Sequence, residues 1–150
     1  MARGYPDFLA TPAYAGFGYV YREYGPWHTI PSGETYDAIS IVGQGTTMGG
    51  LVQFDMANES NLLVTPTFVI DGVAVQLPTV AGWEDLQCLG ETDLFYRLVE
   101  YNVYDGGVEA SLTIVPGTTW GLSLILRFYN ATVFNVDVDT LLYYRKCERL

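Results

Sequence analysis

The chain has 150 residues, 49% of them hydrophobic and 15% aromatic, which is the size and apolar content of one globular domain rather than of a disordered protein. Seventeen acidic side chains against seven Lys and Arg give a formal net charge of -10. Because nucleic-acid binding requires cations that neutralise phosphates, this balance excludes direct binding of nucleic acid.

The beginning of the sequence and its apolar runs predict neither export nor a membrane span. Residues 1–7 run directly into Pro, Gly and Tyr, and the apolar run 122–126 is far shorter than the roughly 20 residues of a membrane-spanning helix. We therefore expect a soluble protein made in the cytoplasm, with no membrane partner. Cys88 and Cys147 lack the spacing of a zinc site and are expected to be small packed residues, with a disulfide between them left open.

Residues 1–31 differ from the rest of the sequence. They combine prolines and glycines with many aromatic residues, a composition that suits neither a helix nor a long central strand. We expect an extended N-terminal arm that lies on its own domain or on a neighbouring subunit, followed by a β-sandwich domain over residues 32–150. The predicted partner-binding residues are aromatic side chains of this arm: Tyr5, Phe8, Tyr14, Phe17, Tyr19, Tyr21 and Trp27.

After the arm, the pattern is that of strands and turns. Alternating or apolar runs predict strands at residues 36–42, 50–56 and 62–70. Asp71-Gly72 favours a tight hairpin turn that leads into a strand at residues 73–77. The glycine-rich segment 43–50 lacks the lysine of a phosphate-binding loop, and we expect a flexible loop between strands there.

The middle of the sequence is less uniform. Residues 83–89 predict a short helix with Glu84 and Asp85 near its start, where acidic side chains interact favourably with the helix dipole. Residues 93–104 fit a helical stripe and a strand equally well. The tripeptide at residues 105–107, Asp-Gly-Gly, predicts a second hairpin turn.

The last third has the clearest sheet pattern. The apolar run 121–129 predicts a buried strand, and residues 133–140 alternate strictly. Three side chains of the alternating run are expected to point inward, Phe134, Val136 and Val138, and three outward, Asn135, Asp137 and Asp139. About eight short strands with little helix predict an all-β fold, an antiparallel β-sandwich with a jelly roll as the favoured type.

The sequence has no pattern that indicates a catalytic site. His28 is the single histidine, and no Gly-x-Ser-x-Gly motif is present. The outward row Asn135, Asp137 and Asp139 carries the oxygen ligands that calcium takes, but a spacing of about 6.5–7 Å along a strand favours a solvated face or a face that binds a partner's arginine. We therefore expect no catalytic activity, no cofactor and no metal.

Charge is distributed unevenly along the sequence. Residues 23–96 contain ten acidic side chains and no Lys or Arg, whereas five of the seven basic side chains occur near the ends: Arg3, Arg22, Arg145, Lys146 and Arg149. A contact in which the termini of one subunit meet the acidic face of a neighbour is therefore electrostatically favourable. Simple solubility is an equally good explanation of the same charges.

Four short segments give the chain a resemblance to a protein class: residues 3–8, 69–73, 126–130 and 142–145. They resemble segments of the small jelly-roll structural proteins of tailed bacteriophages and related viruses, which decorate or cement a capsid. The resemblance implies a virion protein without enzymatic activity that self-associates, often as a trimer. It also implies binding to the major capsid protein or other virion subunits through terminal arms.

The sequence leaves two other functions open. In a carbohydrate-binding β-sandwich, Trp83, Trp120 and exposed tyrosines would stack on sugar rings while acidic side chains accept hydrogen bonds from hydroxyl groups. A sandwich-type enzyme would need two facing carboxylates, and the sequence identifies no such pair among its seventeen acids.

Overall fold

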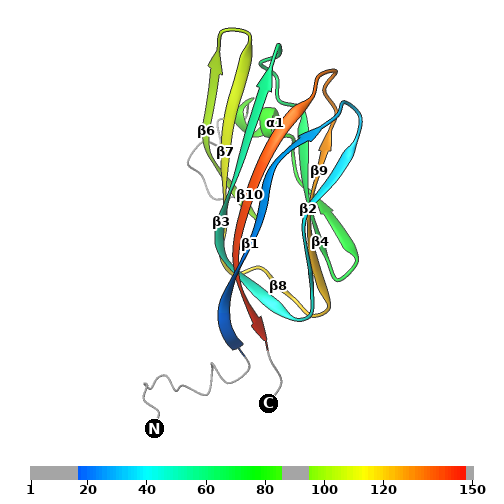
Figure 1. The fold of residues 1–150 in the computed structure, drawn as a ribbon, viewed down its shortest axis with the longest axis vertical. Coiled ribbons are helices and arrows are strands. Elements are labelled where there is room, and N and C mark those ends of the chain that lie inside the picture. The colour runs from blue at the N-terminus through cyan, green and yellow to red at the C-terminus, as the bar shows by residue number, and fades with distance from the viewer. Residues whose placement is uncertain (1–16, 86–94, 148–150) are drawn as a thin grey trace.

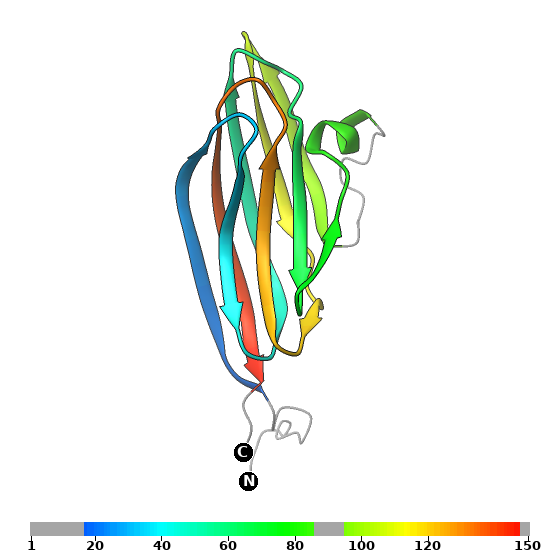
Figure 2. The same ribbon diagram turned by 90° about the vertical axis from the view of Figure 1, so that its right-hand side faces the viewer.

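Two antiparallel sheets packed face to face form the structure, a computed structural model that describes residues 17–85 and 95–147 (Figures 1 and 2). In chain order the elements are β1 (Phe17–Ile30), β2 (Thr35–Val42), β3 (Gly45–Ala57), β4 (Val64–Ile70), β5 (Val73–Gln76), α1 (Val80–Asp85), β6 (Tyr96–Tyr104), β7 (Gly107–Ile114), β8 (Thr119–Trp120), β9 (Ser123–Asn130) and β10 (Val136–Cys147). The predicted all-β antiparallel sandwich is confirmed.

The strand pairing is nested. Sheet A has the order β1-β10-β3-β7-β6, with β8 paired to β3, and sheet B has the order β2-β9-β4-β5. In chain order, β4 and β5 lie between the paired strands β3 and β7, these lie between β2 and β9, and these in turn lie between β1 and β10. Successive pairs alternate between the two sheets, so the chain is arranged as one long hairpin wrapped into a sandwich.

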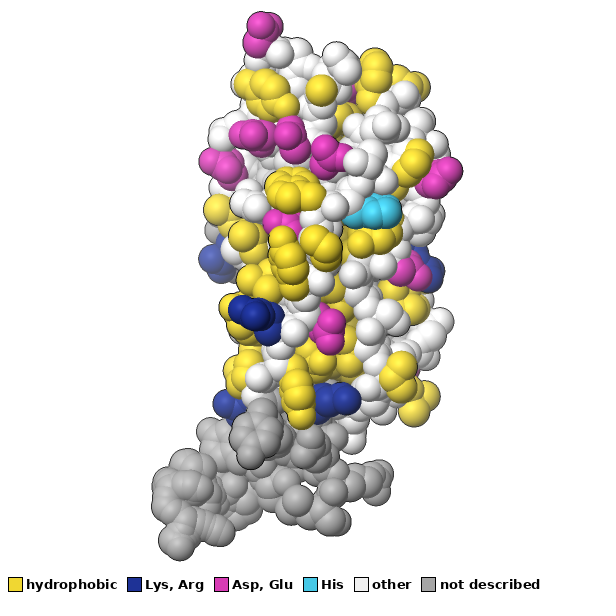
Figure 3. All heavy atoms as spheres, in the orientation of Figure 1, with side chains coloured by type: hydrophobic (Ala, Val, Ile, Leu, Met, Phe, Trp, Pro, Cys, Tyr) yellow, Lys and Arg dark blue, Asp and Glu magenta, His cyan; other side chains and the backbone are white. Residues whose placement is uncertain are grey.

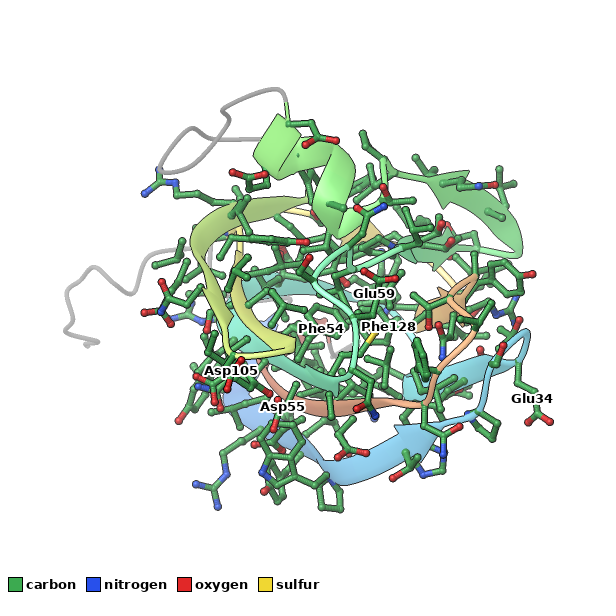
Figure 4. The ribbon with its side chains drawn as sticks, turned by 90° about the horizontal axis from the view of Figure 1, so that it is seen from above. Glu34, Phe54, Asp55, Glu59, Asp105 and Phe128 are labelled. Carbon is green, nitrogen blue, oxygen red and sulfur yellow. The ribbon has the colours of Figure 1, made fainter. Side chains whose placement is uncertain are left out.

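The core lies between the sheets because alternate residues of each strand point inward. Val136 and Val138 of β10 are fully buried, as the alternating pattern predicts. Phe54 of β3 and Phe128 of β9 meet across the interior edge to face, with ring centroids 5.5 Å apart (Figure 4). Packing of this kind fixes the two sheets rigidly against each other.

The extended arm predicted for residues 1–31 is wrong from residue 17 onward. Strand β1 pairs with β10 from Phe17 to Ile30 and forms the edge of sheet A. The register shifts between Gly25 and His28, so Pro26 lies at an irregularity of an edge strand, where its missing N–H costs little. The prolines and glycines of this segment therefore argue only against a central strand, not against an edge strand. A domain boundary at residue 31 would separate β1 from the sheet to which it belongs. Residues 1–16 lie outside the described part.

Both predicted hairpin turns are present. Asp71 and Gly72 connect β4 to β5 with φ values of 54° and 83°, and Gly106 has a φ of 79° between β6 and β7. The expected loop at residues 43–50 is wrong, because β3 begins at Gly45. A Cβ atom at Gly45 would lie 2.5 Å from the ring of Trp120, so glycine serves close strand packing there rather than flexibility.

The middle of the chain differs from the sequence prediction in its helix. Residues 96–104 form a strand, and α1 begins at Val80 instead of near residue 83. Thr79 caps this helix, since its Oγ1 accepts a hydrogen bond of 3.0 Å from the N–H of Gly82. Glu84 and Asp85 lie at the end of the helix, not at its start. In the part of the chain that is described, no helix is long and apolar enough to cross a membrane.

The final strand begins later than predicted because a buried asparagine organises the preceding loop. Nδ2 of Asn130 donates to the carbonyl oxygens of Ile30 and Phe134, at 2.9 and 2.8 Å. Its Oδ1 accepts from the N–H and the hydroxyl group of Thr132. Phe134, expected inward, lies in this loop and is 37% exposed. The expected packing of Cys88 concerns a residue outside the described part.

Candidate functional site on the outer face of sheet A

The outer face of sheet A is made by the residues that alternate with the core. On β10 its residues are Asp137, Asp139, Leu141, Tyr143 and Arg145, each partly or largely accessible. The prediction that Asp137 and Asp139 point outward is confirmed, whereas Asn135 precedes the strand. Figure 3 shows this face over β6, β7, β3, β10 and β1.

Acidic side chains form two rows across one end of this face. Asp137 lies opposite Asp55 on β3, and Asp55 lies opposite Glu109 on β7. The adjacent row contains Asp139 and Glu100. We call these five residues the acidic rows. Like charges directly opposite each other destabilise a sheet, so the acidic rows favour a cationic neighbour.

Hydroxyl groups hold two of these carboxylates in place. The Thr29 hydroxyl donates to Oδ1 of Asp137 at 2.6 Å, and the Tyr104 hydroxyl donates to Oδ1 of Asp55 at 2.7 Å. The hydrogen bond to Asp55 raises the pKa of Tyr104 to about 12. The four residues line a hollow of about 520 Å³ that also includes Asn58, Phe134 and Asn135.

Trp27 borders a second hollow on the same face. Its side chain is 53% exposed, and together with Gln53, Glu100 and Glu109 it lines a volume of about 160 Å³. An aromatic face beside carboxylates suits a guanidinium group, which can stack on the ring and pair with the acids.

Apolar side chains separate the acidic rows from the other end of the face. Tyr24, Leu141 and Leu51 lie side by side on β1, β10 and β3. We call these three residues the apolar belt, and Tyr143 and Trp27 flank it on its two sides. Tyr24 is 58% exposed. A hydrogen bond to Asp139 raises the pKa of Tyr24, which connects the belt to the acidic rows.

Basic side chains lie on the other side of the belt. Arg22 lies opposite Tyr143, and Arg145 lies opposite Val20. A hollow of about 300 Å³ is lined by Arg22 together with Tyr24 and Leu141. In Figure 3 the Lys and Arg side chains of this face lie mainly in its lower half and the acidic ones in its upper half. Along β1, β10 and β3 the face therefore has a negative end, an apolar middle and a positive end, while exposed Arg97 of β6 continues the row of Leu51 and Leu141.

The structure describes only some of the predicted partner-binding residues. Tyr5, Phe8 and Tyr14 lie outside the described residues, and the side chains of Phe17 and Tyr19 on β1 are not described. Tyr21 is half-buried and stacks on Tyr144 of its own chain, with ring centroids 5.6 Å apart. Trp27 lies on the outer face, where a partner can reach it.

The two tryptophans expected to stack on sugars are in the core. Trp83 is 1% exposed and meets Tyr96 edge to face, and Trp120 is 3% exposed and lies against Tyr144. Neither ring can contact a ligand in the folded protein, so that prediction is wrong. The sequence could not reveal this, because both residues follow segments without a regular alternation.

The sequence did not identify Asp55, Glu109 and Tyr104 as members of a site. The only local indication was the alternation of the strands, which predicts that Gln53 and Asp55 of β3 point outward. Which outward residues become neighbours depends on the register of β10, β3 and β7, and register is a tertiary property.

Among the described residues, no group of three or more His, Cys, Asp or Glu is arranged to hold a metal ion. His28 stacks on Tyr36 at a centroid distance of 3.8 Å, at the edge between the two sheets. The face therefore has the chemistry of a binding surface, with aromatic rings, carboxylates and guanidinium groups. In comparisons with known proteins, no family model matches the sequence and no curated protein matches it significantly.

Proposed function

We propose that the chain is a virion structural protein that self-associates and binds a capsid shell, as a decoration, cement or minor capsid protein. The observation that carries the proposal is the outer face of sheet A, where Tyr24 and Trp27 are each more than half exposed. Aromatic groups gathered on a rigid sheet face are typical of a protein interaction surface. The partners would be copies of the same chain and major capsid subunits.

The nested strand pairing supports a jelly-roll architecture. A jelly roll is a long antiparallel hairpin wrapped into two sheets, and it recurs in viral capsid and lectin domains. The four nested pairs, with β6 and β8 as additions to sheet A, match that description. The hydrophobic core between the sheets, around Phe54 and Phe128, is consistent with a rigid structural subunit.

Quantitative mass spectrometry of purified particles from the source of the sequence tests the proposal. The expected result is that the chain copurifies with the major capsid protein at a fixed molar ratio through a density gradient. Particles that lack the chain should also take up the purified protein to the same ratio. Absence from the particles, together with no binding of the added protein, would overturn the proposal.

The hollow beside Tyr104 favours carbohydrate binding as a second candidate function. Tyr104 and Phe134 supply aromatic surface, while Asn58, Asn135 and Asp137 supply acceptors and donors for hydroxyl groups. This combination is typical of sugar sites, where ring stacking and directional hydrogen bonds act together.

A glycan array with the intact chain tests this second candidate. Binding that disappears in Asn135→Ala, and that persists in the matched variant Asn102→Ala on the exposed surface of β6, is the expected result. An array without binding, or equal binding by the two variants, contradicts it.

A further inference from the structure

We propose that the outer face of sheet A binds a second copy of this chain face to face, related by a two-fold axis that crosses the strands at Leu141. The inference rests on the proposed self-association and identifies its surface and symmetry. It combines the positions of the acidic rows, the apolar belt and the basic residues described above.

Two opposite charges on β10 lie symmetrically about Leu141. Asp137 lies four residues before it and Arg145 four residues after it. At a rise of about 3.4 Å per residue, each charge is about 14 Å from Leu141. A two-fold rotation about an axis across the strands at Leu141 therefore places Asp137 of one copy over Arg145 of the other, twice.

The neighbouring strand repeats this complementarity. Arg22 of β1 lies one row beyond the belt, opposite Tyr143, and Asp139 lies one row before it, opposite the irregularity that contains Trp27. The same rotation places Arg22 of one copy between Trp27 and Asp139 of the other. A guanidinium in that position stacks on the indole ring and pairs with a carboxylate.

Other face-to-face arrangements are electrostatically unfavourable. An axis parallel to the strands would place the acidic rows of the two copies over each other, and Asp55, Asp137 and Glu109 already repel one another within one chain. Like charges brought together in an interface cost several kcal/mol. The charges of β1, β10 and β3 thus favour the antiparallel arrangement, in which Arg97 of β6, in the row of Leu141, is the one charge that faces its own counterpart.

The face is near the minimum size for a dimer. Strands β1, β10 and β3 cover the length from Asp137 to Arg145, whereas β7 and β6 cover only the part from Asp137 to Leu142, and at about 4.8 Å between strands they form a surface on the order of 550 Å² per subunit. That is close to the lower limit of specific protein interfaces, which bury roughly 600–1,000 Å² per partner. The apolar belt lies at the centre of this area and the charges lie at its rim, as in known interfaces.

Charge reversal tests the arrangement in the full chain by sedimentation equilibrium. Asp139→Arg and Arg22→Asp are each expected to weaken the dimer at least about tenfold, because each places like charges together across the interface. The double variant restores the opposite charges with their signs exchanged and should return to within about threefold of wild type. Glu34→Arg makes the same charge change as Asp139→Arg on a loop far from Asp55 and should leave the dimer unchanged (Figure 4).

Cysteine cross-linking tests the axis independently of charge. In a Cys88→Ser, Cys147→Ser background, Leu141→Cys should form a disulfide between copies, since residues on the axis meet their own counterparts. Gln53→Cys lies on the same face one row from the axis, so its counterpart is about 14 Å away, beyond disulfide reach. Circular dichroism and urea unfolding identify any variant that does not fold.

The two proposals fail in different ways. A wild-type protein that associates but is insensitive to both reversals and forms no Leu141→Cys cross-link overturns the interface and leaves the virion role intact. A dimer that responds as expected but is absent from purified particles supports the interface and overturns the virion role. A monomer at all concentrations overturns the interface, and the particle-binding experiment then decides the virion role separately.

Discussion

The inner and outer faces of sheet A are made by alternate residues of the same strands, but they differ in what they require. On β10, Val138 and Leu142 are fully buried, whereas Asp139 and Leu141 between them are partly accessible. The inner face requires mainly apolar side chains of the right volume, with Thr140 as a buried polar residue between Val138 and Leu142. Along β10 the outer face changes from acidic through apolar to basic. This order affects the energy of the protein mainly when another surface binds to the face.

The largest difference between the two faces should appear in stability. Phe54→Ala removes a ring from the interior contact with Phe128 and should lower the free energy of unfolding by about 3–5 kcal/mol. Val99→Ala, at a side chain that is 46% exposed on β6, should change it by less than about 0.5 kcal/mol. Urea unfolding monitored by fluorescence measures both. Equal effects would contradict the assignment of the core.

The second prediction concerns the buried hydrogen-bond network of Asn130 at one end of the sandwich. Asn130→Ala removes the buried Nδ2 donor to the carbonyl oxygens of Ile30 and Phe134 and the Oδ1 acceptor of Thr132, and should cost about 2–4 kcal/mol. Asn102→Ala, at an exposed asparagine of β6, provides the matched control. Urea midpoints of the two variants within experimental error of each other would show that the buried network does not organise this end.

The third prediction is a pH dependence from a surface carboxylate. Asp71 accepts hydrogen bonds from the N–H groups of Gly121, Leu122 and Ser123, and these bonds lower its pKa below the ordinary value of 3.8. Because the folded pKa is the lower one, this stabilisation is present above pH 3.8 and is lost as the pH falls through the folded pKa.

Unfolding curves between neutral and strongly acidic pH check the third prediction. Asp71→Asn keeps a side-chain acceptor and tolerates the left-handed backbone of the turn, but it cannot titrate. Its stability should therefore fall less steeply than that of wild type in the acidic range. Parallel curves for the two proteins would be inconsistent with the lowered pKa.

The smallest effect is expected on the outer face at Tyr104. Its pKa is raised to about 12 by the hydrogen bond to Asp55. The stabilisation that follows is complete below the ordinary pKa of 10.0 and is lost as the pH rises toward about 12. Asp55→Asn should bring one tyrosine titration back toward 10.0, measured by ultraviolet absorbance. An unchanged titration curve would contradict the contact.

Much of the architecture was predictable because a period of two residues records which side of a strand is buried. The strands at Val52 to Met56, the turn at Asp71-Gly72 and the outward position of Asp137 all followed from local pattern. The errors have a common cause in tertiary context. Pro26 is acceptable in β1 because that strand is an edge, and Gly45 belongs to a strand because Trp120 lies against it.

The site was less predictable than the fold. Trp27 could be selected as an exposed aromatic residue, but Trp83 and Trp120, which have the same chemistry, are buried. Asp55 and Glu109 are far apart in sequence and meet only through the pairing of β3 with β7. No local pattern carries that information, because register is set by packing across the whole sheet.

The sequence by itself determined the fold class, most of the strands and the excess of negative charge, since each depends on residue type and short-range spacing. The tertiary structure alone decided which side chains share a face. It placed acidic residues from β3, β6, β7 and β10 together at one end of sheet A and Arg22 and Arg145 toward the other. The physical reason is that charge complementarity is a property of positions in space, and strands distant in the chain acquire those positions only by pairing.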